Sequence, residues 1–436
     1  MFEKLNQVIE RKLMPIANRL SSQRHLKAIR DAFISLLPIT LAGGIVAVLN
    51  AAPVTETTTN GFLLAWKAFA DSNSFLFGWV NALTLGAMSL YICIGITYFL
   101  CRHYKLVPFQ PILLSVFGFL LLMMTPLELG WAGKTVEISY LDGKGLLPAI
   151  FIAIFAVEAY QFMRSRNWGR IKLPDSVPAS LSETFASLVP SIVVIGVYVA
   201  IFAGFNAYDT TLPQFIYKVI SPTLSAADSL PFTILITLAV HLFWFFGIHD
   251  AALAGILGPI RDGNLSINAA AQMAGQALPA TFTTSFWVYF VIIGGCGSVL
   301  ALAILLVRSK SKQLRTVGGI GILPAFFGIS EPIIFGVPLM LNPIFFIPFL
   351  LTSTVNAIIS FILISNGFIE KTFAMLSWNM PNVFGAFLST MDWKAAVLVI
   401  FLIILDAIIY YPFFKTYERN LVKLENEPAV ETVESK

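Results

Sequence analysis

The sequence contains a series of apolar segments long enough to cross a lipid bilayer, and this feature restricts the folds open to the chain. A membrane-spanning helix needs roughly 17–25 mostly apolar residues. Charged residues make up only 12% of the chain, whereas a soluble domain is typically about 25% charged. The pattern predicts an all-α integral membrane protein. The segments lie near residues 28–50, 73–100, 107–125, 146–163, 184–205, 229–248, 284–307, 343–366 and 394–414.

Lysine and arginine are concentrated in some of the connecting segments and sparse in the others. Connecting segments rich in these residues stay on the cytoplasmic side of a membrane. The basic clusters therefore predict which connections are cytoplasmic, and they also account for the net charge of +4. The clusters are Lys4 to Arg30, Arg102 to Lys105, Arg164 to Lys172, Arg308 to Arg315 and Lys415 to Lys423.

This orientation requires one crossing that hydropathy alone does not reveal. The segment 284–307 must run inward to reach its basic cluster, so the chain crosses the membrane once within residues 249–286, a region broken by Gly and Pro. Residues 316–342 begin and end on the cytoplasmic side and are expected to form a re-entrant hairpin. The prediction is about ten transmembrane helices, re-entrant hairpins and two cytoplasmic termini.

The broken segments divide the chain into unequal halves. Irregular backbone survives at membrane depth only where protein or a water-filled cavity satisfies its polar groups, and transporters build binding sites from such segments. We expect a scaffold domain over residues 1–205, an amphipathic connector over 206–228, a substrate-binding transport domain over 229–414 and a cytoplasmic tail over 415–436.

The first 20 residues and the cysteines argue against several other classes of protein. Basic and acidic residues interrupt residues 1–20, so no cleavable signal is expected there; an amphipathic helix on the membrane surface or a solvated cap on the protein fits better. Cys93, Cys101 and Cys296 lie in or beside apolar segments without metal-ligand spacing. The sequence shows no phosphate-binding loop. No cofactor, metal or nucleic-acid partner is expected.

Few ionisable residues remain at membrane depth in the C-terminal half, and they are the first candidates for a functional site. A charge there is costly and usually marks a substrate or ion pathway. Glu331 and His249 are the leading candidates, with a buried structural ion pair as the alternative. Asp250 either joins the site or caps the following helix. His241 lies eight residues before His249, which favours a structural role.

Aromatic and polar residues near these positions suggest what the site binds. Tryptophan faces pack against the C–H-rich faces of sugar rings, while carboxylate, imidazole, amide and hydroxyl groups bind sugar hydroxyls. Tryptophan also gathers at membrane interfaces, and Trp393 at the end of a span is expected to do only that. The candidate lining residues are Trp244, Trp287, Trp378, Thr281, Thr283, Thr284 and Asn382.

Three motifs in the C-terminal half give the chain a family resemblance. They are HLFWFFGIHD (241–250), LPATFTTSF (278–286) and GGIGILPAFFGISEPIIFGVP (318–338). With them, the whole chain resembles the sugar-transporting IIC component of the bacterial phosphoenolpyruvate-dependent phosphotransferase system, in its lactose/cellobiose/diacetylchitobiose branch. The GISEP segment is the most specific part of the resemblance.

The resemblance implies a site, a fold and partners. It implies that Glu331 and His249 contact the sugar, that the protein is a homodimer joined by its N-terminal domain, and that it lies in the bacterial cell membrane. It also implies that a phosphocysteine on a IIB protein donates the phosphoryl group to the sugar, with its 6-hydroxyl as the expected acceptor. Phosphoryl transfer needs a group that takes the proton of the acceptor hydroxyl, and we expect Glu331 to do so. Because the sequence ends soon after the last span, IIB is expected to be a separate protein, which favours a cellobiose or diacetylchitobiose substrate.

These observations lead to three functional hypotheses. The first is a phosphotransferase-system permease that binds a β-linked disaccharide and presents it for phosphorylation; the donor residue lies on IIB, so whether this chain counts as an enzyme stays open. The second is a proton-coupled sugar transporter with Glu331 or Asp250 as the proton carrier. The third, a structural membrane protein, leaves the broken C-terminal half unexplained.

Overall fold

The structure is a computed structural model, and it describes residues 23–54, 58–128, 134–138, 140–169, 179–250 and 253–426. The predicted N-terminal helix over residues 1–20 and the end of the cytoplasmic tail lie outside the described residues.

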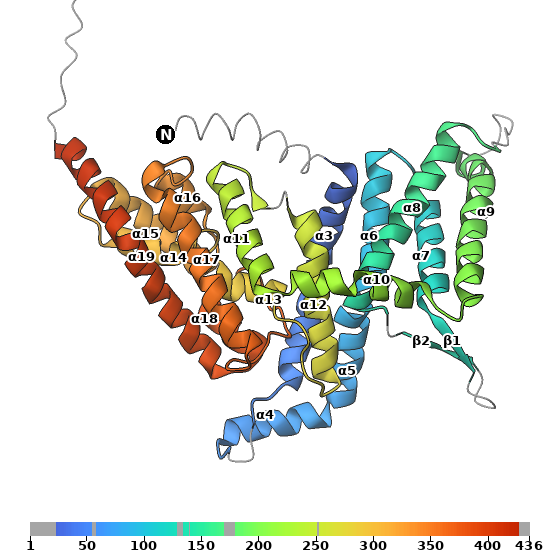
Figure 1. Ribbon diagram of the computed structural model, residues 1–436, viewed down its shortest axis with the longest axis horizontal. Coiled ribbons are helices and arrows are strands. Elements are labelled where there is room, and N and C mark those ends of the chain that lie inside the picture. Colours follow the sequence, from blue (N-terminus) through green and yellow to red (C-terminus); the bar gives the residue numbers. More distant parts are fainter. Residues whose placement is uncertain are drawn as a thin grey trace, which may run out of the picture.

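The described chain is helical along most of its length (Figure 1). Its described strands form one short antiparallel hairpin, in which Thr125 lies opposite Glu137. The first half contains α3 (Arg24–Asn50), α4 (Gly61–Ser72), α5 (Ser74–Leu83), η2 (Leu85–Ala87), α6 (Met88–His103), α7 (Phe109–Met123), β1 (Thr125–Glu128), β2 (Lys134–Glu137), η4 (Gly143–Gly145), α8 (Leu146–Ser165) and α9 (Ala179–Asn206). The second half contains α10 (Leu212–Ala227), α11 (Leu230–Phe245), α12 (Ala254–Met273), α13 (Thr284–Phe286), η6 (Trp287–Val291), α14 (Val299–Val307), α15 (Lys312–Phe326), α16 (Glu331–Gly336), α17 (Pro343–Ser365), α18 (Asn382–Thr390) and α19 (Trp393–Asn426).

The helices correspond to the predicted apolar spans. Within the described residues, six helical segments are long and apolar enough to cross a membrane, and α7 and α11 are shorter apolar helices. The span predicted over 284–307 is broken into α13, η6 and α14, and α12 occupies the region in which a hidden crossing was expected. These elements agree with an all-α membrane protein whose C-terminal half contains the broken segments.

The two halves have separate apolar cores. In the first half, α6 and α8 bury one core through Ile92, Ile96, Ala153 and Val157, all inaccessible to solvent. In the second half, an aromatic core surrounds η6, α14 and α17. Helix α10 crosses between the two parts in Figure 1, where the sequence predicted an amphipathic connector.

Helices α15 and α16 form the hairpin that the sequence predicted over residues 316–342. Helix α15 begins at the N-cap Ser311, whose hydroxyl accepts a hydrogen bond from the Leu314 N–H. After α15 the chain reverses at Gly328, where φ is +78°, a conformation that favours glycine. Gly321 lets the two helices pack closely, because a Cβ atom there would lie 2.3 Å from the Ile333 side chain. The hairpin therefore depends on glycine at its turn and at its helix contact.

Residues 366–392 form a further reversing segment, which the sequence analysis did not single out. The chain leaves α17 without regular secondary structure and returns as α18. Side chains satisfy the irregular backbone: Asn268 donates to the Thr372 carbonyl at 2.8 Å, and Ser285 donates to the Ala374 carbonyl at 2.6 Å. The Tyr289 hydroxyl accepts from the Ser377 N–H and donates to the Ser377 carbonyl. The segment is therefore held by neighbouring elements.

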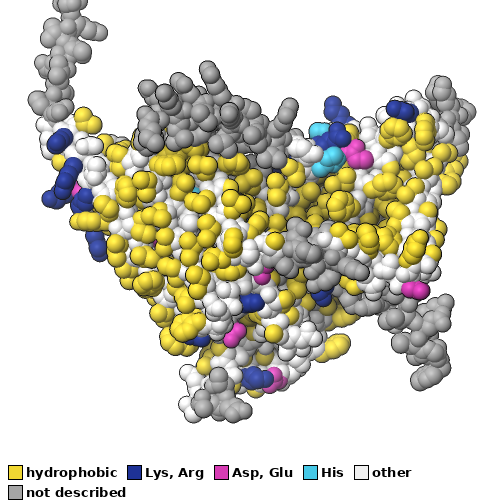
Figure 2. Space-filling model, viewed as in Figure 1, with side chains coloured by type: hydrophobic (Ala, Val, Ile, Leu, Met, Phe, Trp, Pro, Cys, Tyr) yellow, Lys and Arg dark blue, Asp and Glu magenta, His cyan; other side chains and the backbone are white. Residues whose placement is uncertain are grey.

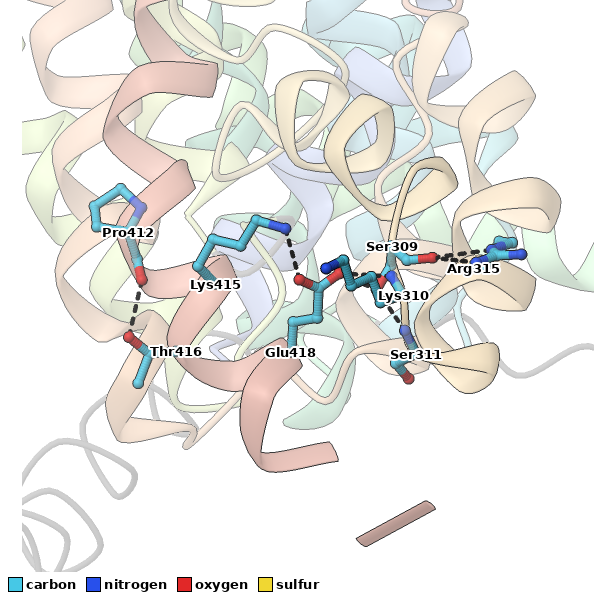
Figure 3. Close-up of polar contacts among 8 residues, drawn as sticks. All are labelled: Ser309, Lys310, Ser311, Arg315, Pro412, Lys415, Thr416 and Glu418. Carbon is cyan, nitrogen blue, oxygen red and sulfur yellow. Dashed lines mark hydrogen bonds and ion pairs between the residues drawn. The ribbon is translucent and has the colours of Figure 1, made fainter. Parts of the chain in front are cut away.

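The buried carboxylate of Glu418 ties α19 to the turn between α14 and α15 (Figure 3). It accepts hydrogen bonds from the Ser309 hydroxyl and the Lys310 N–H, both at 2.7 Å, and from the Lys415 ammonium at 2.6 Å. Arg315 adds two hydrogen bonds to the Ser309 carbonyl. The base of the α15–α16 hairpin is therefore fixed to the last helix.

The start of α3 and the end of α19 lie on the same side of the molecule, the upper side in Figure 1. Figure 2 shows a surface that is mostly hydrophobic over its middle, with Lys and Arg side chains gathered at the upper and left edges and others below the middle and near the lower tip. Several of the predicted basic clusters lie at helix ends: those of α6, α8 and α19, and the turn between α14 and α15.

We predict that Glu418→Ala lowers the free energy of unfolding by about 1–3 kcal/mol, because it leaves buried donors without an acceptor. Thermal unfolding of the purified protein in detergent measures this loss. Thr416→Ala is the matched control, because it removes a hydrogen bond between the exposed Thr416 and the Pro412 carbonyl and is expected to change stability by less than about 0.5 kcal/mol. Equal stability losses in the two variants would contradict the proposed tie.

Candidate functional site

A cavity of about 320 Å³ lies between α3 of the first half and the elements of the second half. Small-molecule sites commonly measure roughly 300–1,000 Å³. Helix α3 supplies an apolar wall that includes Phe33 and Leu37. The remaining walls come from the end of α11, from α12 and from the tip of the α15–α16 hairpin. The acidic, basic and histidine residues of the lining are Arg30, His249, Asp250, Arg261, Asp262 and Glu331.

Glu331 reaches the cavity because it is the first residue of α16. The reversal at Gly328 ends α15, and Pro332 then suits the first turn of α16, where its missing N–H costs nothing. Ser330 is held against Gly295, where an added Cβ atom would lie 2.5 Å from the serine Cβ. The Glu331 side chain is 45% exposed. Its carboxylate is therefore placed by a rigid turn and is open to a ligand.

His249 and Asp250 lie together on the opposite wall, just after α11. The His249 Nδ1 atom is 2.9 Å from the Asp250 carboxylate. The Trp244 indole N–H donates to the same carboxylate at 3.3 Å, and the Trp244 and His249 rings are 4.5 Å apart. Asp250 thus fixes the orientation of both rings.

The space between His249 and Glu331 is suited to a bound hydroxyl group. The His249 Nε2 atom and the Glu331 Oε1 atom are 3.9 Å apart, which is within ion-pair distance but longer than a hydrogen bond. The His249 imidazole therefore lies between two carboxylates. It is close to that of Asp250 and farther from that of Glu331. A ligand hydroxyl could donate to Glu331 and interact with His249 there. Among the described residues, no group of three or more His, Cys, Asp and Glu side chains could hold a metal ion.

Trp378 and Arg261 complete the cavity, and the sequence analysis missed Arg261. Trp378 lies within the reversing segment 366–392, and its ring is 5.8 Å from the Arg261 guanidinium. Arg261 projects from α12 and is only 5% exposed. Its signal in the sequence was the Arg261–Asp262 pair inside the predicted hidden crossing, where charges are costly.

The other predicted site residues do not line this cavity. The Thr281 N–H donates to the Asp228 carboxylate. The Asn382 side chain accepts from the Gly294 N–H and donates to the Val288 carbonyl, bracing η6 and the residues that follow it. His241 is fully buried against Trp287, in the structural position expected for it. The cavity brings together Glu331, His249, Asp250, Trp244 and Trp378.

Comparisons with known proteins agree with this architecture. The family model for the phosphotransferase system EIIC matches residues 30–353. The chain is 31% identical to the lichenan permease IIC component of Bacillus subtilis (strain 168), an alignment that covers 97% of this chain and 96% of that protein. It is 29% identical to the oligo-beta-mannoside-specific EIIC component of the same organism, with 99% and 97% covered.

A relative with an additional region and a solved structure extend these comparisons. The lactose-specific EIICB component of Staphylococcus aureus (strain N315) is 31% identical, and the alignment covers 98% of this chain and 74% of that protein. The crystal structure of the transporter ChbC, the IIC component from the N,N'-diacetylchitobiose-specific phosphotransferase system, matches with a TM-score of 0.86 at 26% identity. That match covers 96% of this chain and 99% of ChbC, and it confirms the predicted fold class.

The family model spans most of the chain, and the relatives align with it nearly from end to end. The chain therefore belongs to the EIIC family, the multi-pass membrane permeases of the phosphotransferase system.

Proposed function

We propose that the cavity binds a β-linked disaccharide of the cellobiose or diacetylchitobiose type and presents its 6-hydroxyl for phosphorylation by a separate phosphorylated IIB protein. The observation that carries this proposal is the meeting of Glu331, His249 and two tryptophans in one cavity. Each of these four residues comes from a segment that ends or reverses beside the cavity.

The chemistry of the lining suits a neutral sugar. The indole faces of Trp244 and Trp378 offer apolar surfaces for the C–H faces of sugar rings. Carboxylates accept hydrogen bonds from hydroxyl groups, and an imidazole can donate or accept one. A small number of polar groups on a largely apolar surface is the usual composition of a small-molecule site.

Phosphoryl transfer needs an acceptor oxygen held in line with the donor and a group that takes its proton. In the proposed step, the sugar 6-oxygen forms a bond to phosphorus while the sulfur–phosphorus bond of the donor phosphocysteine breaks. The electron pair of the broken bond stays on the cysteine sulfur, and the hydroxyl proton passes to Glu331. His249, oriented by Asp250 at 2.9 Å, helps to hold the hydroxyl.

The names of the relatives support the substrate class. They refer to lichenan, oligo-β-mannoside, lactose and N,N'-diacetylchitobiose, and these sugars share a β-glycosidic linkage. The family does not favour the alternative of a proton-coupled transporter, because its members belong to a phosphotransferase system. Uptake of unphosphorylated sugar driven by a proton gradient alone, in vesicles without IIB, would revive that alternative.

We assign the side that holds the start of α3 and the end of α19 to the cytoplasm, with both termini there. The basic clusters on this side support that orientation. An exposed basic surface on it lies at the α14–α15 turn and on the end of α19, and we propose that it attracts phosphorylated IIB, whose phosphoryl group is negatively charged. This basic surface consists of Arg308, Lys310, Lys312, Arg315, Arg419 and Lys423.

We further propose that the protein is a homodimer joined through the N-terminal domain, residues 1–205, and that residues 229–414 form the transport domain. The family resemblance of the sequence supports this arrangement, and the large exposed apolar residues on α9 offer a surface for it. The mass of the purified protein in detergent, corrected for bound detergent, tests the proposal. A mass of one chain at micromolar concentration would contradict it.

We predict that Glu331→Gln lowers the rate of sugar phosphorylation by about 10²–10⁴-fold, the usual contribution of a general base. Gln keeps the size of the side chain and can still hydrogen-bond, so binding of the unphosphorylated disaccharide should weaken much less. Radiolabelled disaccharide binding and phosphoryl transfer from purified phospho-IIB measure the two properties separately. Phosphorylation at the wild-type rate would remove Glu331 from the proton-accepting role.

We predict that reversing two charges of the basic surface, with Arg308→Glu and Arg419→Glu together, slows transfer from phospho-IIB at least tenfold at low salt. Electrostatic steering raises association rates and weakens as salt increases, so the defect should shrink at high salt while disaccharide binding stays unchanged. Lys67→Glu on α4 is the matched control, because Lys67 is exposed and pairs with Asp71 at the other side of the molecule. A salt-independent defect, or an equal one in the control, would argue against this docking surface.

A further inference from the structure

Arg261 is a deeply buried arginine that the proposed function does not use. Its side chain is 5% exposed and faces the cavity. Within the described part of the chain, its Nε atom has no hydrogen-bond partner and no carboxylate lies within 4.0 Å of its guanidinium. Burying a charge without a direct hydrogen-bonded partner is costly, which makes the guanidinium a candidate for ligand binding.

The neighbours of Arg261 hold it in place without using its donors. The guanidinium lies 5.3 Å from the Trp287 ring and 5.8 Å from the Trp378 ring. Aromatic faces attract a cation but accept no hydrogen bond of the strength that a carboxylate does. The adjacent Asp262 accepts a hydrogen bond from the Thr284 hydroxyl. The Asp250 carboxylate contacts the His249 imidazole and accepts a hydrogen bond from the Trp244 indole N–H. The forked N–H groups of Arg261 are therefore fixed and available.

The other arginine of the cavity makes the contrast clear. Arg30 donates from Nε and Nη2 to the Asp31 carboxylate at 2.9 and 2.7 Å. Its charge is paired on its own helix. Arg261 lies deeper than Arg30 and lacks such a pair, so the two residues are not equivalent parts of the lining.

We propose that Arg261 forms an anion subsite that binds the phosphoryl group of the disaccharide 6-phosphate formed in this cavity. A planar guanidinium matches two oxygens of a phosphate monoester, and such charge-assisted pairs are among the strongest hydrogen bonds in proteins. A neutral disaccharide carries no group of this kind. The subsite rests on the proposed function, and it assigns to this chain a contact with the phosphoryl group itself.

The subsite is tested by binding of two ligands to the purified full-length protein: a radiolabelled β-linked disaccharide, and the same disaccharide carrying a 6-phosphate, which competes with it. We expect Arg261→Gln to bind the neutral disaccharide within about twofold of wild type. The same variant should bind the 6-phosphate about 10- to 100-fold more weakly, the usual range for losing a charge-assisted pair. Its phosphorylation rate should also fall.

Arg261→Lys separates charge from geometry and covers the case in which the glutamine variant fails to fold. Lysine keeps the positive charge but loses the planar fork, so its affinity for the 6-phosphate should lie between those of wild type and Arg261→Gln. If the glutamine variant does not fold, the lysine variant alone should show a loss for the 6-phosphate and none for the neutral sugar. Arg166→Gln is the matched control, because Arg166 is exposed at the end of α8 and outside the cavity.

Two outcomes overturn the subsite while leaving the proposed function intact. Equal losses for the neutral sugar and the 6-phosphate would make Arg261 a sugar contact or a structural residue. Unchanged affinity for both ligands in the substituted proteins would leave the guanidinium without a ligand role. A wild-type protein that binds neither disaccharide would refute the proposed function itself, and the subsite with it.

Discussion

The structure depends on one constraint: inside a bilayer, a polar group finds its partners in the protein or not at all. Ordinary helices meet this requirement within their own backbone, and most of the first half of the chain is built in this way. The second half departs from it at α13 to α14, at the α15–α16 hairpin and at residues 366–392. The backbone of that last segment finds its partners in side chains of neighbouring elements, such as Asn268, Ser285 and Tyr289. The broken segments are thus costly features that the fold supports at several points.

The same constraint explains why the functional groups are gathered in one place. The cavity between α3 and the second half holds Glu331, His249, Asp250 and Arg261, and charged groups tolerate burial better near one another than alone. Each of them is positioned by a break in a helix or by a neighbouring ring. Glu331 follows the reversal at Gly328, and Asp250 follows the end of α11. The interruptions that weaken the regular fold are therefore what bring these side chains together.

The sequence predicted the site residues whose polar side chains are costly to bury in their own apolar surroundings. A carboxylate at Glu331 and an imidazole at His249 stand out in apolar surroundings, and the bilayer rule makes them conspicuous without any knowledge of their neighbours. Arg261 escaped notice because it lies in a polar, glycine-rich region that hydropathy reads as a loop. The reversal within residues 366–392 escaped for a different reason: a segment of mixed polar and apolar residues between two spans looks like an external connection unless its long-range hydrogen bonds are known. Thr281 and Asn382 have suitable chemistry but lie outside the cavity. The Thr281 N–H donates to the Asp228 carboxylate, and the Asn382 side chain binds backbone groups of Gly294 and Val288. Only tertiary contacts reveal these partners.

The charges of the cavity also bear on the order of events in the proposed reaction. Two arginines face three carboxylates, and Arg30 is paired with Asp31 outside that set. A neutral sugar enters this environment without changing its charge, whereas a phosphoryl group brings negative charge that the carboxylates oppose. When Glu331 takes the hydroxyl proton, one of the three carboxylates becomes neutral as the sugar becomes anionic. The proton transfer therefore removes repulsion at the moment when Arg261 gains an anion to bind, so one step couples the roles proposed for the two residues.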